Sequence, residues 1–171
     1  MTDEQLAQQI TEGNREAFHE LYERHKKGIY NFALRFLLDK NLAEDAAHNV
    51  FLLVFEHIYQ FDFRKGKFTT WLYSITYHEC CKMRKRNKKF SRLGDGEEEI
   101  KNESNYDYND AIDLERAMLR LPEIYRLPIV MTKLHGLTSA ECASTLGISE
   151  TNVKQRVFRA FKILKEYYNI R

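Results

Sequence analysis

Residues 137–164 read LTSAECASTLGISETNVKQRVFRAFKIL, and this stretch predicts two helices joined by a tight turn. Thr138 and Glu141 have the spacing of a capping box, which marks where the first helix begins. Gly147 supplies the turn, and Ser149 is placed to cap the second helix. The stretch therefore has the pattern of a helix-turn-helix.

The second of these helices has one apolar side and one basic side. The expected core face consists of Val153, Val157, Ala160, Phe161 and Leu164. The opposite side carries Thr151, Lys154, Gln155, Phe158, Arg159 and Lys162. Between Lys154 and Lys165 the chain holds five Lys or Arg and no Asp or Glu. A capped helix pair with one basic side is typical of a protein that reads duplex DNA.

Length and composition limit the classes open to the rest of the chain. With 171 residues, 43% of them hydrophobic, it can form one large domain or two small ones. Two prolines, seven glycines and long helical periodicity favour an all-α protein. No run approaches the roughly 18 apolar residues of a membrane span, and the polar N-terminus is not expected to be a signal peptide. Three cysteines without disulfide or CxxC spacing indicate a reducing compartment, so we expect a cytoplasmic protein.

Charge is segregated along the chain although the net charge is only +2. Residues 82–92 hold seven Lys or Arg and no acid, whereas residues 94–110 hold seven acids and one Lys. Apolar periodicity is also lost in the acidic stretch, as in a linker extended by self-repulsion. We therefore expect two small helical domains, over 1–90 and 112–171, joined by an acidic flexible linker over 91–111.

The first domain is predicted to contain four helices. A short helix follows Asp3, and three longer ones are expected over 15–38, 42–60 (with Asn41 as its cap) and 70–89. The apolar positions of the 42–60 helix are Ala46, Val50, Leu53, Val54 and Ile58, flanked by Ala47, Phe51 and Phe55. The remaining stripe consists of Asp45, His48, Asn49, Leu52 and Glu56. Such a stripe is usually a solvated face; the alternative is a docking surface for a partner helix.

The segment 61–69, FDFRKGKFT, combines three Phe with three cations around a glycine. Rings and cations on a short loop suit single-stranded nucleic acid, because bases stack on the rings while cations hold the phosphates. The candidate residues are Phe63, Arg64, Lys65, Lys67 and Phe68. The alternative is that Phe61, Phe63 and Phe68 anchor the loop on the core. For any single Phe, anchoring on the core is the better interpretation. For the loop as a whole, anchoring and nucleic-acid binding are equally well supported.

The 70–89 helix begins with TWLYSITYHECC and ends in a cationic cluster. Trp71, Leu72 and Ile75 are expected to pack inward, with Tyr73 and Tyr77 intermediate. The cluster comprises Lys82, Arg84, Lys85, Arg86, Lys88 and Lys89. Six cations exceed what a helix C-terminus needs, so we expect contact with phosphates.

Catalysis finds little support in the sequence. The six His have no HExxH or other metal-ligand spacing, and the chain has neither a Gly-rich phosphate loop nor a GxSxG elbow. We therefore expect a protein that is not an enzyme and that uses no cofactor or metal.

Taken together, these segments resemble the extracytoplasmic-function (group IV) sigma factors, the two-domain initiation subunits of bacterial RNA polymerase. EAFHELYERH (16–25) and LAEDAAHNVFLLVF (42–55) resemble the family's first conserved region. FTTWLYSITYHECCKMRKR (68–86) is similar to its promoter-melting helix. LPEIYRLPIVMTKLHGLTSAECASTLGISETNVKQRVFRA (121–160) is similar to its C-terminal domain, so the resemblance covers nearly the whole chain.

The resemblance implies roles for individual residues. The polymerase β′ clamp helices would be bound through Asp45, His48, Asn49 and Leu52. The 61–69 loop would capture a flipped base of the −10 element, and duplex opening would involve Trp71, His78, Lys82 and Arg84. The second domain would sit on the β flap and read the −35 element through Thr151, Asn152, Lys154, Gln155, Arg156, Phe158, Arg159 and Lys162. The acidic linker would thread the RNA exit path.

Three places depart from the family's usual residues. The family commonly has Gln-Glu where this chain has His48-Asn49, which makes the polymerase-facing stripe less acidic here. It often has Asn at the position of His78. Its recognition helix usually begins Gly-Thr-Val-Lys-Ser-Arg, whereas this chain has TNVKQR at 151–156. Val153 and Lys154 therefore persist, and a different base preference is expected.

The resemblance also implies partners: core RNA polymerase, promoter DNA and a membrane-associated anti-sigma factor, with no membrane insertion by the chain itself. Two other classes remain open. A stand-alone helix-turn-helix transcriptional regulator accounts for 112–171 but not for the 61–69 loop or the helix of Trp71. A helical adaptor that binds only protein accounts for the stripe but not for the basic recognition face.

Overall fold

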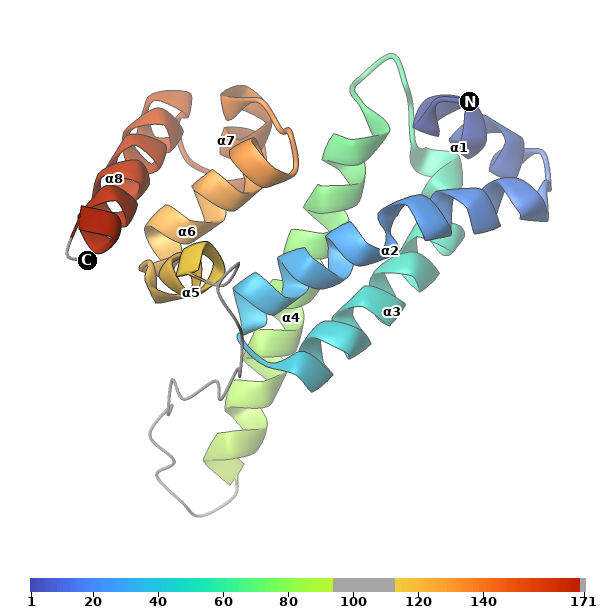
Figure 1. The fold of residues 1–171 in the computed structure, drawn as a ribbon. Coiled ribbons are helices and arrows are strands. Elements are labelled where there is room, and N and C mark those ends of the chain that lie inside the picture. Colours follow the sequence, from blue (N-terminus) through green and yellow to red (C-terminus); the bar gives the residue numbers. More distant parts are fainter. Residues whose placement is uncertain (94–112, 170–171) are drawn as a thin grey trace. The chain divides into compact units, whose positions relative to one another are not determined.

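The computed structural model describes residues 1–93 and 113–169, and every regular element in these two ranges is helical (Figure 1). The all-α prediction is therefore confirmed. Among the described helices, none combines the length and the apolar character that a membrane crossing requires.

The chain divides into two compact units, residues 1–102 and 103–171, and each is described by itself. The acidic linker expected over 91–111 lies outside the described residues from residue 94 onward. Its first three positions do not leave the helix, because α4 (Phe68–Leu93) continues through them.

The first unit consists of α1 (Asp3–Thr11), α2 (Arg15–Leu37), α3 (Lys40–His57) and α4, with a short 3-10 turn, Ile58–Gln60, after α3. α2 and α3 lie side by side and α4 packs against both, while α1 lies against one end of α2 beside the loop that precedes α4 (Figure 1). Each helix contributes fully buried apolar side chains to one core, the largest of which are Leu6, Leu21, Ile29, Phe32, Phe36, Val50, Val54, Phe68 and Leu72.

The turn between α2 and α3 is shorter than the sequence predicts. Leu38 ends α2 in the left-handed conformation, with φ 58°. Asp39 then caps α3 at once, and its carboxylate accepts the N–H of Leu42 at 2.9 Å. The predicted cap, Asn41, is wrong: it lies in the first turn of α3. A carboxylate two residues earlier makes the same kind of bond and also suits the positive end of the helix dipole.

Tyr73 is buried, although the sequence predicts an intermediate position. Its ring packs on Phe32, with centroids 5.6 Å apart. Its hydroxyl lies over Gly28 in α2, where an added Cβ would meet it at 2.7 Å. The absent side chain of Gly28 thus makes room for the phenol. Burial raises the pKa of Tyr73 to about 12, so the phenol stays protonated at neutral pH.

The second unit consists of α5 (Asp113–Arg120), α6 (Glu123–Ile129), α7 (Ser139–Leu146) and α8 (Glu150–Asn169). α6 continues into a π-helical turn, Val130–Leu134, where the N–H of His135 donates to the carbonyl of Val130 at 3.2 Å. Pro128 in the preceding turn has no N–H to donate, which is one known cause of such a widened turn.

The buried Arg126 ties α6 to the end of α5. Its Nη1 donates to the carbonyl of Leu119, in the last turn of α5, at 2.8 Å and to that of Leu121, just after the helix, at 2.9 Å. These two bonds hold the corner between α5 and α6. The core beneath it contains Ala117, Met118, Leu121, Leu127, Ile129, Val130, Met131, Cys142, Val153, Ala160 and Leu164.

Candidate nucleic-acid and polymerase interfaces

The helix-turn-helix forms where the sequence predicts it. Both bonds of the capping box are present: the N–H of Glu141 donates to Thr138 Oγ1 at 3.1 Å, and the N–H of Thr138 donates to Glu141 Oε2 at 2.7 Å. Gly147 ends α7 with φ 68°. Ser149 Oγ then accepts the N–H of Asn152 at 3.2 Å and starts α8. These local bonds set the turn that presents α8.

α8 buries a narrower face than predicted. Val153, Ala160 and Leu164 are buried and Val157 is half-buried, so these four pack against α6 and α7. The prediction that Phe161 belongs to the core is wrong, because its side chain is 49% exposed. Residues 160 and 161 are about 100° apart on a helix, and the buried position is taken by the small Ala160. Phe161 therefore enlarges the exposed aromatic surface of α8.

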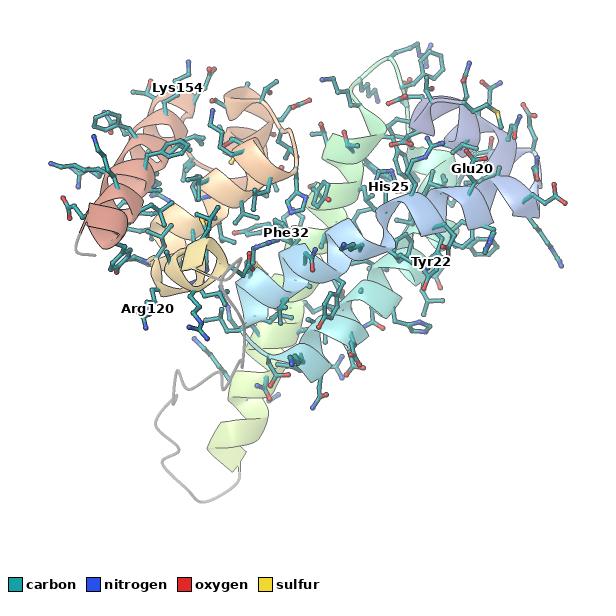
Figure 2. All side chains as sticks on the ribbon, viewed as in Figure 1. Glu20, Tyr22, His25, Phe32, Arg120 and Lys154 are labelled. Carbon is teal, nitrogen blue, oxygen red and sulfur yellow. The ribbon has the colours of Figure 1, made fainter. Side chains whose placement is uncertain are left out.

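The outward side of α8 carries the side chains expected to read DNA. Thr151, Lys154, Gln155, Phe158, Arg159 and Lys162 are all exposed, and Figure 2 shows Lys154 near the start of the helix, on its outer side. Phe158 is 72% exposed, so both its ring and the cations beside it can reach a ligand. Asn152 and Arg156 are half-buried at the edge of this face.

One member of this face has a partner in the free protein. The ammonium of Lys154 lies 2.7 Å from Glu150 Oε1, one turn earlier on α8. Both side chains are well exposed, so the pair is weak and can open when another anion approaches. Glu150 also suits the positive end of the α8 dipole.

The predicted docking stripe on α3 is exposed for most of its length. Asp45, His48, Leu52 and Glu56 all face solvent. Asn49 does not share that orientation, because its Nδ2 donates to Oε1 of Glu79 on α4 at 3.1 Å. Asn49 is half-buried, and its amide is directed into the α3–α4 contact, so its part in the polymerase-facing stripe stays a prediction.

The exposed apolar part of this stripe is larger than the sequence predicts. Phe55, expected beside the core, is 59% exposed, and Tyr59 in the following turn is 68% exposed. With Leu52, 51% exposed, they continue the stripe at intervals of three and four residues. Phe55 also meets the ring of Phe18 on α2 edge-on, at 5.2 Å. The spacing from Leu52 was the signal in the sequence that could have identified both residues.

The three Phe of the 61–69 segment differ in how deeply they are buried. Phe68 is fully buried, so it is an anchor and offers no ring face to a base; its placement among the DNA contacts is a correction. Phe61 is half-buried and packs on Phe68 at 5.4 Å and on Trp71 at 5.6 Å. Phe63 is 64% exposed and is the ring of the three that a base can reach.

The cations of this loop follow Phe63 directly in the sequence. Lys65 and Lys67 are exposed. Arg64 pairs with Asp62 through two contacts, Nε to Oδ1 at 2.9 Å and Nη2 to Oδ2 at 3.0 Å, and the pairing lowers the pKa of the Asp62 carboxyl. Two of the five guanidinium N–H groups are used in this way, which leaves the others to meet a phosphate.

The candidate DNA-contacting residues of α4 differ in burial and in the side chains that they contact. Trp71 is half-buried against Phe61 and Phe68, and His78 is exposed. Lys82 is exposed and lies 3.4 Å from the buried carboxylate of Glu79. Arg84 is half-buried, with its guanidinium carbon 4.4 Å from the ring centroid of Phe36 on α2. Exposed cations continue beyond it: Lys85, Arg86, Lys88 and Lys89.

Cys80 on α4 and Cys142 on α7 are buried. Burial raises the pKa of Cys80 to about 12 and that of Cys142 to about 11, so both remain thiols at neutral pH. Within residues 1–93 and 113–169, no three His, Cys, Asp or Glu side chains gather in a way that could hold a metal ion.

Family models match both units. Residues 21–90 match the model described as Sigma-70 region 2, and residues 111–164 match Sigma-70, region 4. Among characterised relatives, the ECF RNA polymerase sigma factor SigM of Bacillus subtilis is 28% identical over 156 residues, covering 88% of this chain and 94% of the relative. SigW of the same species, also an ECF RNA polymerase sigma factor, is 28% identical over 174 residues, covering 92% of each.

Solved structures show the same fold. CnrH, solved in complex with the cytosolic domain of CnrY, aligns with a TM-score of 0.69 at 23% identity, over 98% of this chain and 97% of its own. The sigma factor RpoE from Bartonella quintana, solved with the anti-sigma factor NepR, aligns with a TM-score of 0.69 at 22% identity, over 90% and 97%. With both sigma-70 regions matched and the curated relatives covered almost end to end, the chain belongs to the extracytoplasmic-function sigma factors of RNA polymerase.

Proposed function

We propose that this sigma factor directs core RNA polymerase to promoters by holding the DNA at two points, α8 on the −35 element and the 61–67 loop with α4 on the −10 element. One observation carries the proposal: each unit presents an exposed Phe among exposed cations, Phe158 on α8 and Phe63 on the loop. Two weak DNA contacts give tight binding when the polymerase holds both domains, because the second contact is then intramolecular.

The −35 contact is proposed to form in the major groove. Lys154 or Arg159 would pair with guanine edges, Gln155 with adenine, and Phe158 would contact a thymine methyl. Arg156 and Lys162 would hold phosphates, together with the turn at Thr151 and Asn152. The exposure of Lys154, Gln155 and Arg159 supports this assignment.

The −10 contact is proposed to use single-stranded DNA. Phe63 would stack on a base flipped out of the non-template strand, while Arg64, Lys65 and Lys67 hold the flanking phosphates. Trp71 and His78, with Lys82 and the later cations of α4, would follow the opened strand. The exposure of Phe63, against the burial of Phe68, supports placing the base at Phe63.

The polymerase contact is proposed to lie on α3. Asp45, His48 and Leu52 would bind the β′ clamp helices, extended by the exposed rings of Phe55 and Tyr59. The second unit would rest on the β flap. Residues 1–90, 91–111 and 112–171 would then be the polymerase-binding and −10 domain, the linker in the RNA exit path and the −35 domain.

Membership of the family suggests where the protein acts and how it is regulated. We propose that the protein acts in the cytoplasm, where the polymerase works, as a binding subunit that performs no catalytic step. Regulation by an anti-sigma factor, membrane-associated or free, is proposed from the two complexes in which its structural neighbours were solved.

Run-off transcription with purified chain and core polymerase tests the proposal. Promoters selected from a random library should give transcripts that depend on the chain, and Phe63→Ala should weaken opening while leaving the −35 footprint. Arg15→Ala, far from both surfaces in sequence, serves as a matched surface control. If duplex binding persists without any promoter-dependent transcript, the protein is a helix-turn-helix regulator instead. If neither appears and only protein binding remains, it is an adaptor.

A further inference from the structure

α4 begins at a place where the local sequence offers it no cap. The residues before Phe68 are Lys65, Gly66 and Lys67. The first N–H groups of a helix need acceptors, and the positive end of its dipole disfavours cations. A Lys side chain has no acceptor atom. The cations that suit this loop to phosphates therefore leave the start of α4 electrostatically unsupported.

The missing acceptor comes from α1, 64 residues earlier in the chain. The backbone N–H of Phe68 donates to Oε1 of Glu4 at 3.1 Å. The same bond is the main reason that the pKa of the Glu4 carboxyl is lowered. Glu4 thus occupies the role that Ser, Thr, Asp or Asn usually plays from the residue just before a helix.

Glu4 is held on a firmly mounted helix. The neighbouring Asp3 accepts from Arg24 Nη1 at 2.7 Å and lies 2.7 Å from His25 Nε2, both on α2 (His25 is labelled in Figure 2). Thr2 and Gln5 make both bonds of a capping box at the start of α1. The other side of α1 is buried through Leu6, Ala7 and Ile10. A carboxylate on such a helix is fixed in space, unlike one on a loose terminus.

The residue that Glu4 caps is also the anchor of the promoter loop. Phe68 is fully buried, and its ring packs on Phe61, on Trp71 and, at 6.0 Å, on His25. Phe63 and its cations lie in the few residues between Phe61 and Phe68. A shift of the first turn of α4 would therefore move the exposed ring. α1 itself precedes residues 21–90, the part matched by the region 2 model.

We propose that Glu4 is a positioning residue for promoter opening: by capping α4 from α1, it fixes the height and angle at which the 61–67 loop presents Phe63 to DNA. The inference rests on the proposed function of that loop. It assigns to α1 a part in promoter opening that is separate from the polymerase contact on α3 and from the −35 contact on α8.

The experiment compares Glu4→Ala and Glu4→Gln with Glu12→Ala. Gln keeps an acceptor oxygen at the same reach. Glu12 is an exposed acid at the other end of α1 whose carboxylate accepts from Gln8, so its removal makes the same charge change without touching α4. All measurements are made well below the thermal transition of each variant, with the circular dichroism spectrum checked for native helix content.

Two measurements on the free chain report on the cap itself. Hydrogen exchange of the Phe68 amide should be roughly two- to thirtyfold faster in Glu4→Ala, the range that loss of a helix cap gives in an equilibrium constant. Trp71 is the only tryptophan in the sequence and lies in the first turn of α4, so acrylamide should quench its fluorescence more readily in the same variant. Glu4→Gln should lie between wild type and Ala, and Glu12→Ala should match wild type.

One measurement on the holoenzyme reports on function. Permanganate reactivity of unpaired thymines should show slower promoter opening by Glu4→Ala, by a factor similar to the change in amide exchange, with unchanged core affinity and −35 footprint. Equal opening by wild type and Glu4→Ala would refute the inference, as would an equal loss of core affinity, which would mark a general defect of the unit. Failure of the wild type to open any promoter would instead overturn the proposed function.

Discussion

The side-chain amide of Asn49 on α3 donates to the carboxylate of Glu79 on α4 at 3.1 Å, and Glu79 is only 4% exposed. The helix expected to bind polymerase and the helix expected to follow the promoter strand are thus joined by a partly buried polar bond. The acceptor is further held by Lys82 at 3.4 Å. A buried carboxylate depends on such partners, because losing one leaves its charge poorly solvated.

Replacing Asn49 should therefore act on stability. Asn49→Ala is expected to lower the free energy of unfolding by about 1.5–3 kcal/mol, the range for a hydrogen bond to a charged group. His48→Ala, one residue away and exposed, should leave stability nearly unchanged and weaken binding to core polymerase. Urea denaturation and a core-binding titration measure the two effects. Weak core binding by a fully stable Asn49→Ala would show that the amide faces the polymerase after all.

Substitution of Phe63 should weaken DNA binding, whereas substitution of Phe61 should weaken packing. Phe63→Ala is expected to cost about 1–3 kcal/mol in binding of −10 single strand, the value of one stacked base, with little loss of stability. Phe61→Ala should instead lower the melting temperature, because it removes ring contacts with Phe68 and Trp71. Calorimetry and strand-binding titrations distinguish them. The reverse pattern would mean that Phe61 carries the base.

Gln155 should read one position of the −35 element. Gln155→Ala is expected to cost about 1–3 kcal/mol at a single base pair and to relax specificity there. Lys165→Ala, a change on the same helix beyond the reading face, should weaken binding uniformly across sequences through lost charge. Competition binding against all single-base variants of the site makes the measurement. A uniform loss for Gln155→Ala would identify it as a backbone contact.

Glu150 should restrain the recognition helix in its free state. Glu150→Gln removes the carboxylate that lies 2.7 Å from the Lys154 ammonium and is expected to raise affinity for any duplex. The dependence of affinity on salt should steepen at the same time, because one more cation can reach a phosphate. Binding measured from low to moderate salt tests both effects. The control is Glu166→Gln, which removes an acid from the same helix that has no described ion pair with the DNA-reading face. An equal rise in duplex affinity for Glu166→Gln would show that the effect is one of overall charge and does not depend on Lys154.

The Glu4 cap predicts an acid-sensitive contribution to stability. The folded-state pKa of Glu4 lies below its ordinary value of 4.5, so its stabilisation is present above that value and is lost as the pH falls through the folded-state pKa. The stability difference between wild type and Glu4→Gln should therefore be constant near neutrality and shrink in acid. Urea denaturation from pH 7 to pH 3 follows it. A difference that grew in acid would contradict the cap.

Sequence reasoning located the helix-turn-helix well because its signals are local. The capping box at Thr138 and the turn at Gly147 operate within a few residues, so their outcome does not depend on distant parts of the chain. The outward face of α8 followed for the same reason. The fold class and the family were likewise accessible from periodicity and motifs.

The errors came from contacts between distant elements. Phe61, Phe63 and Phe68 are identical residues within eight positions, and only the surrounding helices decide which ring is buried. Asn49 turns inward because Glu79 lies across from it, and α4 is capped by a residue that precedes it by 64 positions. No pattern within a window of the sequence contains those partners.

The hydroxyl of Tyr73 over the bare backbone of Gly28 also limits how this protein can change over generations. An alanine at position 28 would favour the helix by about 1 kcal/mol in isolation, yet it collides with the phenol at once. A lineage can reach that gain only if the buried Tyr73 ring shifts or residue 73 is shortened, so the order of substitutions matters as much as their identity. Positions 28 and 73 are therefore expected to vary together among this protein's descendants.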